Sequence, residues 1–236
     1  MTTYILRHGL TDFSKQYVVN GDPARPVQLN DEGVRLCHRQ RSVLPFHRVR
    51  TWLVSEFPRV QQSASLLMGA LTPELIVDAR LNELDYGRFE SGPFLEYGTW
   101  LARHGGSQRP PAARESQREG IRRMLTGVQA ALEHPEPRVL VCHGLLVSVL
   151  LWHRDRSPDE AMPLFFPEAP YVDPLAVGDE AQNDWIVTLL GELDAEEPQD
   201  PDARGAAAES RTGGCSVVAT FRAVVHSPEK KEPPHA

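Results

Sequence analysis

Two apolar runs in the sequence each end in a histidine followed by a glycine. The first is Tyr4-Ile5-Leu6, followed by Arg7-His8-Gly9, and the second is Val139 to Cys142, followed by His143-Gly144. A histidine held beside a fixed guanidinium can attack phosphorus while the guanidinium binds the phosphoryl oxygens. By itself the Arg-His-Gly triplet is weak evidence, because a polar strand end without any chemistry has the same pattern.

Two further residues have side chains that suit phosphoryl chemistry. Arg59 follows a third apolar run at 50–55 and stands in the expected first turn of a helix, where a cation is mildly unfavourable. This small anomaly favours a functional role. Glu83 stands in a segment without clear period, and a carboxylic acid can donate and accept protons. Taken alone, Glu83 looks like an ordinary solvated carboxylate, and His143 like a buried histidine at a strand end.

Four predicted strands bring these residues to one edge of a sheet. The strands are expected at 4–6, 50–55, 75–77 and 138–142, and the helices at about 30–44, 58–71, 94–101, 116–132 and 145–152. Ser116 and Glu119 form a capping-box pattern before the helix with the clearest apolar stripe. This alternation predicts a parallel sheet covered on both faces, in which ligands bind at the carboxyl ends of the strands.

The C-terminal third of the chain has a different composition. Residues 157–191 are interrupted by prolines and are expected to add one or two helices, and the acidic residues 192–214 are expected to form a loop. Residues 215–225 alternate in polarity as an edge strand does. We therefore expect an α/β fold, a three-layer α/β/α sandwich with a mostly parallel central sheet and one late edge strand. The domain would span 1–226, with an insertion at about 157–214 and a disordered tail at 227–236.

Composition excludes several classes of protein. The formal net charge is −7 and no dense basic tract occurs, so nucleic acid is not an expected partner. The most apolar stretch, 139–152, is too short to span a membrane. Cys37, Cys142 and Cys215 show neither a disulfide framework nor a zinc spacing, and Met1 lies too close to the first strand to leave room for a signal peptide. We expect a cytoplasmic protein and leave open whether it forms a homodimer.

The motifs together resemble those of the histidine phosphatase superfamily, the phosphoglycerate-mutase-like fold, in its larger branch. Four blocks match in order and spacing: Arg7-His8-Gly9-Leu10-Thr11, the segment from Ser55 to Ala64 with Ser63 in place of a threonine, Leu81-Asn82-Glu83 with Gly87, and the strand that ends in His143-Gly144. The resemblance covers residues 4–152, about two thirds of the chain.

The resemblance implies a role for each matched residue. His8 would be the nucleophile that carries a phosphohistidine, and Glu83 would protonate the leaving oxygen and then activate water. Three residues would surround the phosphoryl group: Arg7, Arg59 and His143. Further substrate contacts are expected from Thr11, Asn20, Gly21, Arg25 and Gly144. Neither a metal nor a cofactor is expected, because the protein itself supplies the cations.

Three functions fit these residues. The favoured one is a histidine acid-type phosphatase, a phosphoric monoester hydrolase that acts on a small phosphorylated metabolite. The second is a phosphoglycerate-type mutase, but mutases of this family carry Tyr-Gly-x-Leu-Gln-Gly and nearby lysines after Leu-Asn-Glu. Here residues 86–91 read Tyr-Gly-Arg-Phe-Glu-Ser, and no lysine lies between Lys15 and Lys230. The third, a non-catalytic module that binds phosphate ligands, has no support, since all five core residues are present.

Overall fold

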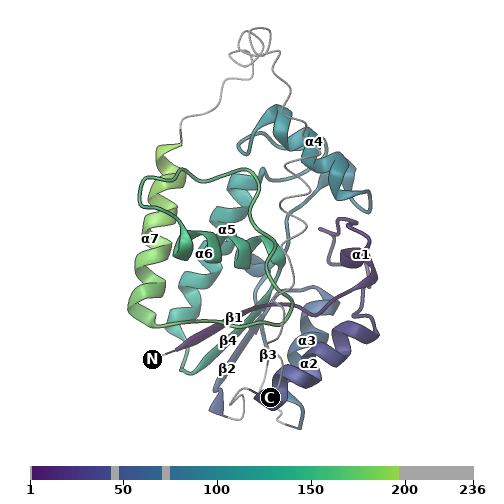
Figure 1. The fold of residues 1–236 in the computed structure, drawn as a ribbon, viewed down its shortest axis with the longest axis vertical. Coiled ribbons are helices and arrows are strands. Elements are labelled where there is room, and N and C mark those ends of the chain that lie inside the picture. The colour runs from purple at the N-terminus through teal and green to yellow at the C-terminus, as the bar shows by residue number, and fades with distance from the viewer. Residues whose placement is uncertain (1, 44–47, 71–74, 197–236) are drawn as a thin grey trace, which may run out of the picture.

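The computed structural model describes residues 2–43, 48–70 and 75–196, and this part of the chain forms an α/β sandwich around one sheet (Figure 1). The strands are β1 (Thr3–Arg7), β2 (Thr51–Val54), β3 (Leu75–Val77), β4 (Arg138–Cys142) and β5 (Leu175–Val177). Their order in the sheet is β3-β2-β4-β1-β5. β1, β2, β3 and β4 are parallel to one another, whereas β5, at the edge of the sheet, is antiparallel to β1. The predicted α/β fold class is confirmed.

Seven α-helices and three short 3-10 turns connect and flank these strands in the described residues. The helices are α1 (Asp12–Lys15), α2 (Asp31–Val43), α3 (Pro58–Met68), α4 (Phe94–His104), α5 (Gln117–Ala130), α6 (Gly144–Asp155) and α7 (Asp179–Ala195), and the 3-10 turns are Ala79–Leu81, Gly87–Phe89 and Ala131–Glu133. The predicted capping box is present, because the Ser116 hydroxyl accepts from the Glu119 amide and the Glu119 carboxylate accepts from the Ser116 amide.

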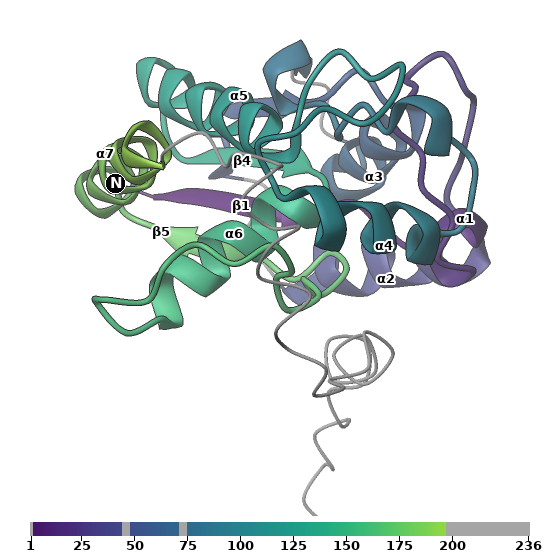
Figure 2. The same cartoon turned by 90° about the horizontal axis from the view of Figure 1, so that it is seen from above.

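The two faces of the sheet bury two separate apolar cores. Successive side chains of a strand point to opposite faces, so Ile5 and Leu6 of β1 enter different cores. Ile5 packs in the core shared with α5, α6 and α7, and Leu6 in the core shared with α2 and α3. Figure 2 shows α1 and α4 at one end of the molecule and α7 at the other, beside the N-terminus. The strands' carboxyl ends are therefore bordered by α1 and α4.

The segment after α6 differs from the sequence-based expectation. It contains β5, which was not predicted, and α7, which continues to Ala195, so the loop prediction is wrong at 192–195. The reason is that Leu193 extends the buried stripe of Ile186 and Leu189, which the neighbouring acidic residues obscure in the sequence. The strand predicted at 215–225 and the tail at 227–236 lie outside the described residues. Among the helices that are described, none has both the length and the apolar character needed to cross a bilayer.

A close backbone contact holds the loop that follows β1. A Cβ atom at Gly33, in the first turn of α2, would lie 2.2 Å from the carbonyl oxygen of Leu10. On the other side, the Gly9 amide donates to the Ser63 hydroxyl of α3 at 2.9 Å. The loop that carries His8 is thus fixed between α2 and α3 by contacts that leave no room for an added methyl group.

We expect Gly33→Ala to destabilise the protein by about 1–3 kcal/mol, the usual cost of overpacking a well-filled site. The displaced atom would be backbone, which cannot rotate away as a side chain can. The measurement is the midpoint of thermal unfolding. Gly191→Ala in α7 is the matched control, because nothing lies within 4 Å of its added Cβ, and it should be neutral or stabilise by about 0.4–1 kcal/mol. Equal midpoints for both variants would contradict this account.

Candidate active site

The parallel pairing of β1 with β4 brings the two strand-end histidines together. His8 follows β1 and His143 follows β4, and their ring centroids lie 5.4 Å apart. Arg59, in the first turn of α3 after β2, reaches both rings. All three side chains are buried, with exposed fractions of 3% for His8, 0% for His143 and 4% for Arg59. The structure therefore assembles the residues that the sequence placed on separate strands.

The hydrogen bonds of His8 define its protonation state. Its Nδ1 lies 2.7 Å from the Gly9 carbonyl oxygen, which can only accept, so Nδ1 carries the proton. Its Nε2 accepts from Nε of Arg59 at 3.0 Å. Burial, followed by the charges of Arg59 and Arg7, lowers the pKa of His8 well below its ordinary value. His8 is therefore a neutral imidazole at neutral pH, with the Nε2 lone pair directed into the site.

The Arg59 guanidinium is a buried cation whose partners are neutral. Beyond His8, it donates to Asn20 Oδ1, to the Asn20 carbonyl oxygen at 3.1 Å and to His143 Nδ1 at 3.1 Å. Among the residues that the structure describes, no carboxylate forms an ion pair with it. Burial lowers the pKa of Arg59 to about 10, so the guanidinium stays charged at neutral pH. A buried charge without a counter-ion is costly, and an anionic ligand would remove that cost.

His143 lies behind Arg59 and does not itself line the pocket. Its Nδ1 accepts from Arg59, so the neutral ring carries its proton on Nε2 and donates to the Ser55 hydroxyl at 2.9 Å. Burial and the Arg59 charge lower the pKa of His143 well below the usual value. In this state His143 orients Arg59 rather than presenting a positive charge.

Glu83 is placed to serve as a proton donor. Its Oε1 accepts from the Leu84 amide at 3.0 Å, and its Oε2 lies 4.0 Å from Nδ1 of His143. Burial raises the pKa of Glu83 above its ordinary value, and the amide bond and the Arg59 charge only partly offset this effect. The carboxyl thus keeps its proton to a higher pH than a solvated glutamate, and it lines the same pocket as His8.

The Arg7 side chain is held in place by residues that are far away in the sequence. Its guanidinium donates to Glu168 at 2.9 Å, to the Ala169 carbonyl at 2.7 Å and to the Tyr171 hydroxyl at 2.8 Å, and it stacks 3.7 Å above the Tyr171 ring. Its buried Nε makes no hydrogen bond within the described part of the chain. The sequence analysis missed Glu168 and Tyr171, which lie in a proline-rich segment without a motif.

The substrate contacts predicted from sequence divide into two groups. Thr11, Asn20 and Gly144 line the pocket, and Gly144 is required there because an added Cβ would lie 3.1 Å from Nε of Arg7. Gly21 and Arg25 do not line it. Gly21 instead allows close packing against the Leu84 carbonyl, 1.8 Å from a Cβ built at that position, while Arg25 is exposed.

Asn20 is itself held in place by a residue that the sequence analysis did not select. Its amide nitrogen donates to Glu90 at 3.1 Å, and Glu90 also accepts from the Gly21 amide at 2.7 Å. The Asn20 oxygens face Arg59. Asn20 is therefore a positioning residue for the guanidinium in this structure, and not a free donor for phosphate.

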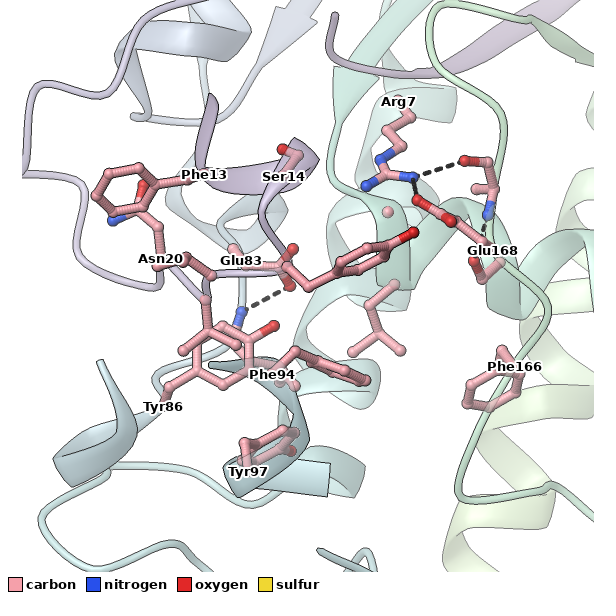
Figure 3. A pocket seen from close by; sticks show the side chains of 18 of the residues that line it. Arg7, Phe13, Ser14, Asn20, Glu83, Tyr86, Phe94, Tyr97, Phe166 and Glu168 are labelled. Carbon is pink, nitrogen blue, oxygen red and sulfur yellow. Dashed lines mark hydrogen bonds and ion pairs between the residues drawn. The ribbon is translucent and has the colours of Figure 1, made fainter. Parts of the chain in front are cut away.

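These residues open onto a cavity of about 220 Å³ (Figure 3). Arg7, His8, Arg59 and Glu83 lie at one end of it, and most of the remaining wall is apolar or aromatic. In Figure 3, Phe94 and Phe166 face the space from different sides, with Arg7 above them. A cluster of three side chains suited to hold a metal ion does not occur among the residues described.

The family model of the histidine phosphatase superfamily (branch 1) matches residues 3–169, which is more than half of the chain. The chain belongs to this superfamily. Its matched region contains each of the five core residues, together with Leu84 and Tyr86, which also line the pocket. The membership was predicted from four short motifs and is confirmed by the match over the whole segment.

The individual proteins to which the chain is similar have low sequence identity with it. Probable phosphoglycerate mutase GpmB of Yersinia pestis is 28% identical over 160 residues, which cover 64% of this chain and 73% of the relative. The alpha-ribazole phosphatase of Shigella flexneri has 21% identity and a TM-score of 0.62, covering 75% of this chain and 90% of that one. A mycobacterial glucosyl-3-phosphoglycerate phosphatase has 22% identity and a TM-score of 0.61, covering 75% and 92%. The two solved structures share the fold.

We expect catalysis to require neutral His8 and protonated Glu83, which gives kcat/KM an acid limb and a basic limb. The lowered pKa of His8 moves the acid limb to lower pH, and the raised pKa of Glu83 moves the basic limb to higher pH. Glu83→Gln should abolish the basic limb and slow substrates with basic leaving groups by about 10²–10⁴-fold, but p-nitrophenyl phosphate much less.

Asp85→Asn is the matched control. The Asp85 carboxylate accepts from the Gly87 and Arg114 amides and does not line the pocket, so the basic limb should persist in this variant. Ionisation of the substrate affects all variants alike. An equal loss for both kinds of substrate in Glu83→Gln would make Glu83 a positioning residue and would contradict its role as the acid.

Proposed function

We propose that this chain is a phosphomonoester hydrolase that acts on a small phosphorylated metabolite through a phosphohistidine on His8. The observation that carries the proposal is the neutral His8 ring, whose Nε2 lone pair faces a buried guanidinium that forms no ion pair with any carboxylate in the described part of the chain. A nucleophile beside an unneutralised cation suits a substrate that is both electrophilic and anionic, as a phosphoryl group is.

In the first step, the Nε–H of Arg59 exchanges Nε2 of His8 for a phosphoryl oxygen, and the freed Nε2 lone pair attacks phosphorus while the bond from phosphorus to the ester oxygen breaks. Protonated Glu83 transfers its proton to that departing oxygen, so the alcohol leaves neutral. The guanidinium groups of Arg59 and Arg7, both of which line the cavity, bind the phosphoryl oxygens. The positive charge that forms on the imidazole is stabilised because Nδ1–H already donates to the Gly9 carbonyl.

In the second step, water attacks the phosphohistidine. The Glu83 carboxylate, now deprotonated, accepts a proton from the water, and the bond from phosphorus to Nε2 breaks. Inorganic phosphate leaves, and both His8 and Glu83 return to their starting protonation states. The cycle consumes one water and needs no external acid or base.

A mutase is the second candidate, because the curated relative from Yersinia pestis is named as a probable phosphoglycerate mutase. A mutase would return the phosphoryl group from His8 to another hydroxyl of the substrate and would use the same nucleophile. The names of the two solved structures, both phosphatases, support hydrolysis instead. The two activities differ in product, so product analysis separates them.

We predict that His8→Ala abolishes turnover and the covalent intermediate. Wild-type protein mixed with a phosphorus-labelled substrate and quenched in alkali should retain label that acid then releases, as a phosphohistidine does. The variant should retain none while unfolding at a similar temperature. His38→Ala, an exposed histidine on α2, is the matched control and should keep the label. Label on a serine or cysteine would exclude the proposed mechanism.

We also predict that the products are inorganic phosphate and a free alcohol, formed without a divalent metal. Phosphorus NMR of a panel of phosphomonoesters in excess EDTA should show inorganic phosphate accumulating at an undiminished rate. Conversion of 3-phosphoglycerate to 2-phosphoglycerate faster than any hydrolysis would establish the mutase. Loss of activity in EDTA that a divalent ion restores would show that the site needs a metal.

A further inference from the structure

The charges around the cavity are few and lie together. Of the described residues that line it, the cationic ones are Arg7, which directly precedes His8 in the chain, and Arg59, which donates to His8. The same lining contains two carboxyl groups, Glu83 and Glu168, and Glu168 already pairs with Arg7. Lys15 is directed elsewhere, since it is exposed and lies 3.4 Å from Glu32. A second anionic group on the substrate would therefore find carboxylates and no additional cation.

Most of the remaining lining is apolar, although Thr11, Ser14, Asn20, Gln117 and Ser148 add uncharged polar groups, and the apolar side chains come mainly from four separate parts of the chain. The loop around α1, the start of α4, the start of α6 and the segment 164–166 each contribute side chains. The apolar lining residues that are half-buried, and therefore still accessible, are Phe13, Val18, Val27, Phe94, Leu145, Leu164 and Phe165. Tyr97 and Phe166, whose aromatic rings are buried, also line the cavity. This composition is typical of a site for an apolar ligand.

We propose that this apolar wall binds the leaving group, so that the substrate is the phosphomonoester of a neutral, apolar alcohol or phenol. The inference rests on the proposed hydrolase function and specifies the substrate class of that site. The cavity of about 220 Å³ is larger than the ~150 Å³ that holds a benzene ring in an apolar protein cavity. It therefore accepts a ring or a branched aliphatic chain beside the phosphoryl group.

The wall also determines what is rejected. A carboxylate or a second phosphate would be desolvated against a mostly apolar wall, and no cation beyond Arg7 and Arg59 occurs in the described lining to compensate for that penalty. Phosphoglycerates and bisphosphates belong to the disfavoured class for this reason. One additional methylene group bound in an apolar pocket raises kcat/KM by about 10- to 200-fold at most. The preference should therefore grow stepwise as the alcohol becomes longer.

The test is a series of alkyl monophosphates from ethyl to hexyl phosphate, whose leaving groups are almost equally basic. We expect kcat/KM to rise at least tenfold over the series. Hexyl phosphate should also exceed, by at least tenfold, the same chain ending in a carboxylate, because the apolar part of the described lining offers the added anion no cation. A flat series, or a preference for the carboxylate or for 3-phosphoglycerate, would overturn the proposal.

A pair of adjacent residues on α4 provides matched variants. Phe94 lines the cavity, whereas Leu95 is 49% exposed and does not line it. In Phe94→Ala, the rise in kcat/KM from ethyl to hexyl phosphate should be at least threefold smaller than in the wild type. Phe94→Tyr should restore most of that rise. Leu95→Ala should leave the series unchanged. If Phe94→Ala and Leu95→Ala behave alike, the wall does not bind the leaving group.

Binding of alkylphosphonates, which cannot be hydrolysed, separates this inference from the proposed function. Calorimetry should show affinity that rises with chain length, together with an increasingly negative heat-capacity change, the marker of apolar burial. If no phosphomonoester is hydrolysed but this trend holds, the hydrolase proposal fails and the apolar subsite stands. If esters are hydrolysed but affinity is independent of chain length, the subsite fails and the hydrolase stands.

Discussion

The buried guanidinium of Arg59 constrains nearly everything around it. A charge removed from water must be solvated by the protein, and here the solvating groups are two imidazole nitrogens and the two oxygens of Asn20. Each of these acceptors is neutral, so each must itself be held in one orientation. Ser55 fixes His143, the Gly9 carbonyl fixes His8, and Glu90 fixes Asn20. The need to stabilise this one buried charge therefore determines how the surrounding side chains are oriented.

The Arg59 guanidinium also influences the protonation states of His8, His143 and Glu83. It adds to the effect of burial in keeping both histidines neutral, and it opposes the effect of burial on Glu83. His8 is therefore available as a nucleophile and Glu83 as an acid in overlapping ranges of pH. Asn20 and Ser55 help to hold this arrangement, so the polar groups that would face a phosphoryl group are already close together, as in preorganised polar sites.

Much of this arrangement could be predicted from the sequence, because short-range patterns carry it. Apolar runs ending in His8 and His143 mark parallel strands, and parallel strands place their carboxyl ends at one edge. Arg59 was selected because a cation is out of place at a helix start, and its burial gives the physical reason. The boundaries of α5 followed from its capping box, a pattern contained within four residues.

The remainder depends on contacts between segments that no local pattern connects. Tyr171 and Glu168 reach Arg7 across more than 160 residues, and nothing near them in the sequence indicates a partner. Asn20 was expected to bind phosphate, since its type fits, but its orientation toward Arg59 is set by Glu90. β5 pairs antiparallel with β1, which lies at the opposite end of the described chain, and no local pattern indicates that pairing.

The position of β1 has a consequence for how the chain acquires its structure. β1 emerges first from the ribosome, yet its sheet neighbours are β4 and β5, which begin at Arg138 and Leu175. Ile5 and Leu6 therefore have no strand to pair with until most of the domain has been synthesised. Such non-local pairing slows folding and leaves an apolar strand exposed during translation. A nascent chain that stalls before residue 138 would contain His8 and Arg59, but it would lack both β4, which pairs with β1, and His143, which orients Arg59.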